Sequence, residues 1–159
     1  GPDILVEVLK ILAKKIKIKV LLTGPARGFV KNKLNFNNIP YIHVYLNTQE
    51  SISEYYKALD LYLVTSREEG GPKGILEGLS SGIPVASTDV GMARDLIQDG
   101  KNGFLCKNFN PVNISNKVKF ALKKENKYLK RNARSTIKRV DWKVISEKHM
   151  NLLYKKLFI

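Results

Sequence analysis

Residues 60–77 read DLYLVTSREEGGPKGILE, and they give the clearest indication of the fold class. Its first six residues, 60–65, are mostly apolar and predict a buried β-strand. Gly70 and Gly71 then permit a tight turn. Pro72 suits the first turn of a helix, because its missing N–H has no internal partner there. A strand, a glycine turn and a helix over 73–81 together indicate a βα unit.

The start of this predicted helix is suited to bind an anion. The amides of Lys73, Gly74 and Ile75 are expected to point out of the helix N-terminus, where no acceptor within the helix exists. Such amides and the positive end of the helix dipole favour phosphate. Lys73 adds a positive charge, and Gly70 and Gly71 leave room for a ligand to approach closely.

Two carboxylates bracket the turn, with seven residues between them. Glu69 lies in the loop and Glu77 about one turn inside the helix. A carboxylate accepts hydrogen bonds from two neighbouring hydroxyls, so either residue suits a sugar beside the phosphates. For Glu77 alone the alternative is as strong, since an acidic residue near a helix start also complements the helix dipole. The combination of strand, glycines, proline and paired carboxylates favours a ligand site.

The strand and helix patterns alternate along the chain up to residue 106. Apolar runs predict strands over 17–23, 42–46, 60–65, 84–87 and 104–106. Helical spacing predicts helices over 4–15, 51–58, 73–81, 93–97, 127–139 and 142–158, with a further helical pattern from residue 111. We therefore expect an α/β, Rossmann-like, doubly wound fold with a mostly parallel sheet, helices on both faces and a helical C-terminal tail. In the last helix, Leu152 and Leu153 are predicted to face inward.

Length and composition indicate a single domain over residues 1–159. One cysteine, Cys106, excludes an internal disulfide and a cysteine-based zinc site. We expect Cys106 to be a small buried hydrophobe, and His43 and His149 to be structural rather than metal-binding. No metal site is expected.

The positive charge is concentrated in the C-terminal third. Residues 101–159 hold 16 of the 28 basic residues and 3 of the 14 acidic ones. Solvated helix faces are one interpretation, and a surface for polyanions or an anionic membrane is the other. A nucleic-acid reader would usually interleave aromatic side chains with the charge, so no nucleic acid is expected as a partner.

Two arginines lie beside the predicted site. Arg27 follows the strand over 17–23 and is a candidate for contact with a phosphate or a base, with a solvated loop position as the alternative. Arg67 precedes the paired carboxylates, and we expect it to form an ion pair with Glu68.

Several further motifs occur in an informative order along residues 4–157. Besides the paired carboxylates, the chain contains SGIPVAS at 81–87, DVG at 89–91, DGKNGFL at 99–105 and Asp141-Trp142 before the last helix. In this order the motifs resemble the C-terminal domain of retaining GT-B glycosyltransferases of the family 4 type.

The resemblance implies a function for the site. Members of this family transfer a sugar from a nucleotide diphosphate donor with retention and without a metal. The transferred sugar is expected to be of the hexose type, and the acceptor a glycan or a lipid-linked molecule. By position, Glu69 would face the transferred sugar and Glu77 would hold the ribose. Gly74 and Ile75 would lie near the diphosphate, and Gly24 beside the donor. A nucleotide-sugar epimerase is a less favoured alternative.

The sequence also departs from the family pattern. Gly70-Gly71-Pro72 replaces the common Gly-Phe-Gly, which removes one amide. The chain begins at the helix that usually follows the first strand of this domain, and the acceptor domain is absent. We therefore expect a donor-binding half that lacks its first strand and is inactive alone, with its own N-terminal acceptor domain as a partner. The expected location is the cytoplasm, as a peripheral protein at the inner face of the membrane.

Overall fold

The computed structural model describes residues 1–123 and 127–154. Five short strands form two sheets: β1 (Val20–Thr23) pairs with β2 (Tyr41–Val44), and β4 (Val85–Thr88) lies between β3 (Tyr62–Val64) and β5 (Gly103–Cys106). The pairings β1–β2, β3–β4 and β4–β5 are all parallel. The expected mostly parallel arrangement is confirmed, with the difference that its strands are divided between two sheets.

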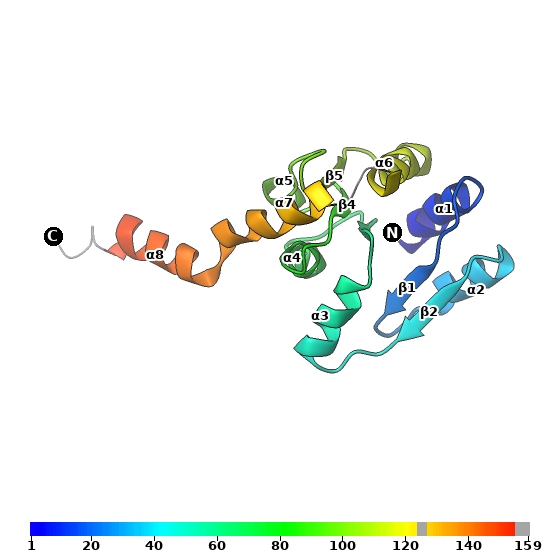
Figure 1. The fold of residues 1–159 in the computed structure, drawn as a ribbon, viewed down its shortest axis with the longest axis horizontal. Coiled ribbons are helices and arrows are strands. Elements are labelled where there is room, and N and C mark those ends of the chain that lie inside the picture. The colour runs from blue at the N-terminus through cyan, green and yellow to red at the C-terminus, as the bar shows by residue number, and fades with distance from the viewer. Residues whose placement is uncertain (124–126, 155–159) are drawn as a thin grey trace.

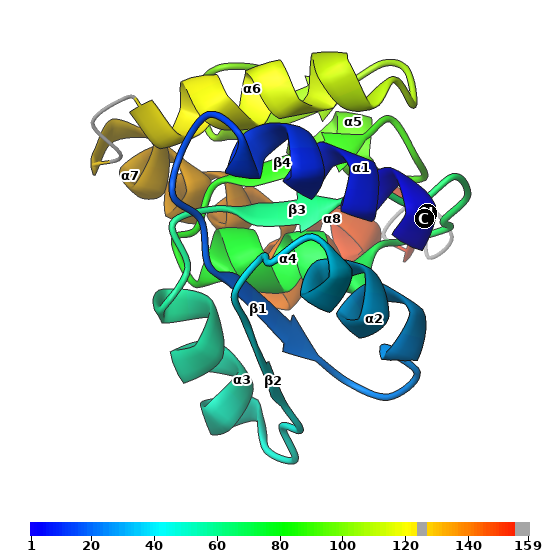
Figure 2. The same ribbon diagram turned by 90° about the vertical axis from the view of Figure 1, so that its right-hand side faces the viewer.

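Helices connect and cover these strands (Figure 1). Their bounds are α1 Pro2–Ala13, α2 Gly28–Phe36, α3 Gln49–Lys57, α4 Lys73–Ser80, α5 Ala93–Leu96, α6 Pro111–Lys123, α7 Lys127–Ile137, the 3-10 helix η1 Lys138–Val140 and α8 Trp142–Leu152. Figure 2 shows α1 and α6 on one side of β3 and β4, and α4 on the other.

The core explains why helices cover both faces of β4. Neighbouring residues of a strand point to opposite faces, and both Val85 and Ala86 are fully buried. Ala86 packs into a cluster with side chains of α1 and α6, whereas Val85 packs with Ile75 and Leu79 of α4. The predicted doubly wound α/β fold is therefore confirmed.

One helix was missing from the sequence prediction. Helix α2 contributes only Val30 and Leu34 to the core, where they pack with Leu22 and residues of α1. With so few apolar positions among lysines and asparagines, α2 has too weak a helical pattern to be recognised from the sequence.

The C-terminal tail is helical as predicted, but one detail is wrong. Figure 1 shows α8 extending away from the body of the molecule. Leu152 and Leu153 are 62% and 55% exposed, so they do not face inward. The predicted continuation of the helix over 155–158 lies outside the described residues. In the part of the chain that the structure describes, no helix is long and apolar enough to cross a membrane.

Candidate functional site

The loops at the carboxyl ends of β1 and β3 line one cavity, and the loop after β4 packs against the β3 loop. In parallel sheets these ends meet at the same edge, which is where ligands of such folds bind. A cavity of about 1280 Å³ lies between β1 and β3. At this edge its lining residues are Thr23, Arg27, Ser66, Glu69, Lys73 and Gly74. The cavity thus brings Arg27 together with Glu69, Lys73 and Gly74, which are more than 40 positions away in the sequence.

The turn after β1 folds back on its own strand. Gly24 adopts a φ of +80°, a left-handed conformation that glycine tolerates. The Gly24 carbonyl lies 2.8 Å from Nε2 of His43, so His43 has the structural role expected of it. The Arg27 Nε donates a hydrogen bond to the Thr23 carbonyl at 2.8 Å. Arg27 is exposed and lines the cavity.

Glu69 is held by Ser66 of its own loop, and Ser66 is held in turn by Thr88 at the end of β4. The Ser66 hydroxyl donates to Oε1 of Glu69 at 2.9 Å, and the Thr88 hydroxyl donates to the Ser66 carbonyl at 2.6 Å. The carboxylate remains exposed, so it is positioned yet accessible. The DVG motif supports the same turn, because a Cβ atom on Gly91 would lie 2.3 Å from the Gly70 carbonyl oxygen. Gly71, next along the turn, faces the sulfur of Met92.

Helix α4 begins at Lys73, as predicted, with Pro72 as its N-cap residue. The expectation that Ile75 offers a free amide is wrong, because its N–H donates to the Pro72 carbonyl at 2.9 Å. The Ile75 side chain is fully buried in the core. An anion at this helix start would therefore meet the amides of Lys73 and Gly74, which have no acceptor within the helix.

Glu77 has two neighbours that fix its carboxylate. The Tyr56 hydroxyl of α3 donates to Oε2 at 3.2 Å, and Nζ of Lys73 lies 3.7 Å from Oε1. Burial raises the pKa of Tyr56, so its hydroxyl keeps the proton that it donates. The sequence analysis missed Tyr56, because 21 residues separate it from Glu77 and no local pattern links them.

Gly74 allows α4 to approach the tyrosines beneath it. A Cβ atom on Gly74 would lie 2.5 Å from the hydroxyl oxygen of Tyr62. The Tyr62 ring packs edge to face against Tyr56, with ring centroids 5.2 Å apart. Burial raises the pKa of Tyr62, and the positive charge of Arg27 partly opposes this shift. The charge of Arg27 therefore acts on Tyr62, the tyrosine that packs beneath α4.

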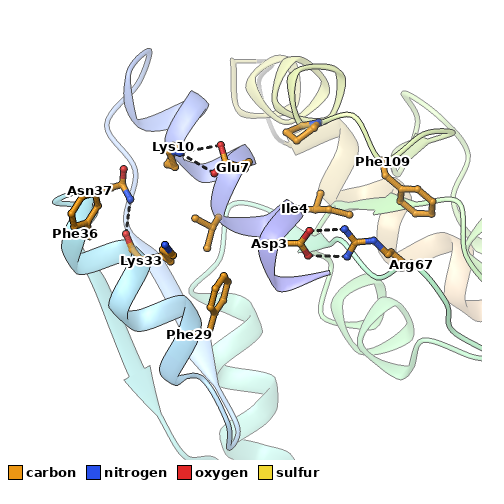
Figure 3. A pocket seen from close by; sticks show the side chains of 12 residues that line it. Asp3, Ile4, Glu7, Lys10, Phe29, Lys33, Phe36, Asn37, Arg67 and Phe109 are labelled. Carbon is orange, nitrogen blue, oxygen red and sulfur yellow. Dashed lines mark hydrogen bonds and ion pairs between the residues drawn. The ribbon is translucent and has the colours of Figure 1, made fainter.

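Arg67 has a different partner from the one expected. Figure 3 shows its guanidinium paired with Asp3 of α1 rather than with Glu68, and one of the two hydrogen bonds measures 2.8 Å. The paired guanidinium holds the pKa of the Asp3 carboxyl well below its usual range. Both residues line a separate groove of about 350 Å³ beside α1 and α2. Arg67 thus ties the β3 loop to the start of α1 and stands apart from the donor-site candidates.

Cys106 is the remaining residue with a reactive side chain, and it is a core residue. Cys106 is buried in the core, and burial raises the pKa of its thiol to about 11. It behaves as the small hydrophobe that the sequence predicts.

A doubly wound fold with an anion-receptive helix start flanked by carboxylates is typical of nucleotide-binding domains. The model of the family described as glycosyl transferases group 1 matches residues 1–137. The chain therefore belongs to the group 1 glycosyltransferases.

Curated relatives and solved structures agree with this assignment. An uncharacterized glycosyltransferase of Haemophilus influenzae is 25% identical over 154 residues, which cover 92% of this chain and 44% of the relative. The sulfoquinovosyl transferase SQD2 of Arabidopsis thaliana is 27% identical over 165 residues, covering 97% of this chain and 31% of its own length. The chain thus spans less than half the length of these relatives.

Among solved structures, a glycosyltransferase of Rickettsia africae matches with a TM-score of 0.83 at 21% identity, over 99% of this chain and 44% of that one. Anabaena HepE, solved in complex with UDP and glucose, matches with a TM-score of 0.78 at 18% identity, over 94% of this chain and 44% of that one. The C-terminal domain of the group 1 protein LpcC from Francisella tularensis matches with a TM-score of 0.73 at 20% identity, over 87% of this chain and 77% of that one. At these identities the likeness concerns the fold.

Proposed function

We propose that this chain is the donor-binding half of a glycosyltransferase. The intact enzyme would transfer a hexose-type sugar from a nucleotide diphosphate sugar to a glycan or lipid-linked acceptor, with retention of configuration. The observation that carries the proposal is the start of α4, where two amides without helix partners lie between Glu69 and Glu77. This arrangement offers donors for a diphosphate and acceptors for the hydroxyls on either side of it.

Each residue of the site has a role in this proposal. The diphosphate would be neutralised by the amides of Lys73 and Gly74 and by the Lys73 and Arg27 side chains, without a metal ion. Glu77 would accept hydrogen bonds from the ribose, with Tyr56 fixing one of its oxygens. Glu69 would orient the transferred sugar. Preorganised donors at the leaving diphosphate stabilise the negative charge that grows there as the glycosidic bond breaks.

The solved structures and the curated relatives support a donor-binding domain that is separate from the acceptor domain. HepE was solved with UDP and glucose, and the LpcC match is a C-terminal domain. Because the curated relatives are more than twice as long as their match to this chain, we propose that the acceptor domain lies elsewhere in the intact protein. The 159-residue chain alone is then expected to bind donor but transfer no sugar.

An amide NMR titration tests the donor site directly. We expect UDP, GDP or ADP to shift the amide resonances of Lys73 and Gly74 selectively, and the effective nucleotide identifies the base. The same titration repeated in EDTA should give the same shifts, because no metal is required. Shifts scattered over the surface, or a need for added metal, would contradict the proposal. The Gly100 amide, in a remote turn, is the internal control.

Tyr56 is expected to position Glu77 for the ribose. Tyr56→Phe keeps the ring and removes the hydroxyl, so the Kd of a nucleoside diphosphate should rise about fivefold, the effect of one hydrogen bond. Isothermal titration calorimetry measures this change. Tyr55→Phe is the matched control, since the Tyr55 hydroxyl is buried without a partner among the described residues. Equal affinities of the two variants would show that Tyr56 does not position Glu77.

We propose, as a second function of the same protein, contact with an anionic membrane at the cytoplasmic face. Helix α7 and the 3-10 helix η1 together hold six Lys and Arg residues and no Asp or Glu, and α8, which follows them, exposes large apolar side chains. Trp142 is 83% exposed, and Leu152, Leu153 and Met150 are each more than half exposed. Basic and aromatic side chains on an exposed amphipathic helix are typical of binding at a membrane surface.

Co-sedimentation of the intact protein with vesicles tests this second function. Binding is expected with phosphatidylglycerol vesicles and not with pure phosphatidylcholine, and it should weaken as salt is added. The double variant Trp142→Ser/Leu152→Ser should bind about tenfold less. Phe36→Ser, on the exposed end of α2, is the control and should bind normally. Salt-insensitive binding, or none, would exclude this function.

A further inference from the structure

The loop over residues 66–71, between β3 and α4, carries Glu69 and lies outside regular secondary structure. Residues 67–71 are exposed. A Cβ atom on Gly70 would meet no described atom within 4 Å, so the outer side of the loop is open at this point. The position of Glu69 therefore depends on a small number of contacts between this loop and the elements beside it.

One of these contacts joins the loop to α1. The Arg67 guanidinium donates a hydrogen bond from each of its two terminal nitrogens to a different oxygen of Asp3, and the bond to Oδ1 measures 2.8 Å (Figure 3). Two parallel bonds between a planar guanidinium and a planar carboxylate fix orientation as well as distance. The pair thus determines where residue 67 lies relative to α1.

Helix α1 is a firm support for this contact. Ile4, which follows Asp3, is 4% exposed, and Val8, one turn further along, is fully buried. Both pack in the core cluster that α1 shares with β4 and α6. The Thr65 hydroxyl donates to the Gly1 carbonyl at 2.9 Å, so the start of α1 also contacts the residue just before the loop. Asp3 therefore cannot move without disturbing the core.

A second contact holds the loop from the side of β4. The Thr88 hydroxyl donates to the Ser66 carbonyl at 2.6 Å, and the Ser66 hydroxyl donates to Oε1 of Glu69 at 2.9 Å. Arg67 lies between Ser66 and Glu69 in the chain, so its pair with Asp3 restrains the segment that the Ser66–Glu69 hydrogen bond closes. Without the pair, rotation about the backbone bonds of residues 67 and 68 would shift Glu69 relative to α4.

Another exposed ion pair of the same groove differs in what it connects. Nζ of Lys10 lies 2.8 Å from Oε1 of Glu7, and both residues belong to α1. Exposed ion pairs add little to stability, so neither pair is expected to hold the fold together. The Glu7–Lys10 pair lies within one helix, whereas the Asp3–Arg67 pair joins a helix to the loop of the candidate donor site. A comparison of the two pairs therefore separates positioning from a general effect of surface charge.

We propose that Asp3 and Arg67 are positioning residues for Glu69, because their ion pair fixes the loop that carries this carboxylate against α1. The role rests on the proposed function, in which Glu69 orients the transferred sugar. Asp3 and Arg67 then act on turnover and leave the affinity for the nucleotide unchanged. A displacement near 1 Å at a reacting group costs about 100-fold in rate. Because Ser66 still holds the loop when the pair is lost, the expected loss is smaller, about five- to tenfold in kcat.

NMR relaxation of the 159-residue chain tests the positioning without nucleotide or acceptor. The Glu69 amide of the wild-type chain should have an order parameter of about 0.85, the value of a rigid backbone. Asp3→Asn and Arg67→Gln should each lower it to about 0.6 or less. Glu7→Gln is the matched control, since it removes an ion pair of α1 that does not reach the loop, and it should change nothing at Glu69. An unchanged order parameter in both Asp3→Asn and Arg67→Gln would overturn the proposal.

Kinetics of the intact enzyme test the effect on turnover. Asp3→Asn and Arg67→Gln should each lower kcat about five- to tenfold and change the nucleotide Kd about twofold or less. The double variant should lose no more than either single variant, because both substitutions break the same pair. Glu7→Gln should keep the wild-type kcat. Additive losses, or a nucleotide Kd weakened as much as kcat, would refute the positioning role. A wild-type enzyme that binds no nucleotide would instead refute the proposed function, and the order parameters would still decide whether the pair holds the loop.

Discussion

Glu69→Gln in the intact enzyme is expected to lower kcat about 100- to 1,000-fold while changing the Kd of the nucleotide about twofold or less. The carboxylate lies in the loop ahead of α4, beyond the amides proposed to hold the diphosphate, so nucleotide binding does not need it. Its charge matters when positive charge develops on the transferred sugar in an oxocarbenium-like transition state. The Ser66 hydroxyl, 2.9 Å from Oε1, holds the carboxylate in place before the reaction starts.

Steady-state kinetics and calorimetry on the same variants separate the roles of the two glutamates. Glu77→Gln should show the opposite pattern, with a weakened nucleotide Kd and a smaller change in kcat. Glu68→Gln is the matched control, because Glu68 is an exposed neighbour on the same loop and has no assigned role. If Glu69→Gln weakened nucleotide binding as much as it slowed turnover, the assignment of Glu69 to the transferred sugar would fail.

The sequence predicted best where local chemistry determines the structure. The helix after Pro72 begins at the predicted residue, because two glycines and a proline leave the chain few alternatives there. Strands β3, β4 and β5 were also predicted, since each is a short apolar run bounded by turn residues. The parallel pairing followed from the alternation of strands and helices.

The errors concern contacts between residues distant in sequence. Arg67 pairs with Asp3, 64 positions away, and no pattern around Arg67 favours Asp3 over the adjacent Glu68. Tyr56 reaches Glu77 from a different helix for the same reason. The Ile75 amide was misjudged because the bond to the Pro72 carbonyl depends on the geometry of the first turn of α4, which residue types alone do not determine.

Gly91→Ala is expected to be strongly damaging, although Gly91 is not itself one of the binding residues. The added Cβ would lie 2.3 Å from the Gly70 carbonyl oxygen and 2.4 Å from that of Glu69. These are backbone atoms, which cannot rotate away, so the turn that carries Glu69 must move. A displacement near 1 Å at a reacting group costs about 100-fold in rate. The loss of unfolding free energy should be about 2–4 kcal/mol, in the range of strained backbone positions with steric conflict.

Gly100→Ala separates conformational strain from the clash. Gly91 and Gly100 have φ values of +48° and +77°, so both substitutions force alanine into a left-handed conformation. A Cβ on Gly100, however, would meet no atom within 4 Å. Gly100→Ala should therefore cost about 1–2 kcal/mol and leave kcat unchanged. Urea unfolding and kcat, measured on both variants of the intact enzyme, distinguish the steric clash from the conformational strain. Equal losses would mean that Gly91 serves only the backbone conformation of its own loop, whereas a larger loss for Gly91→Ala would show that this loop supports the turn on which Glu69 stands.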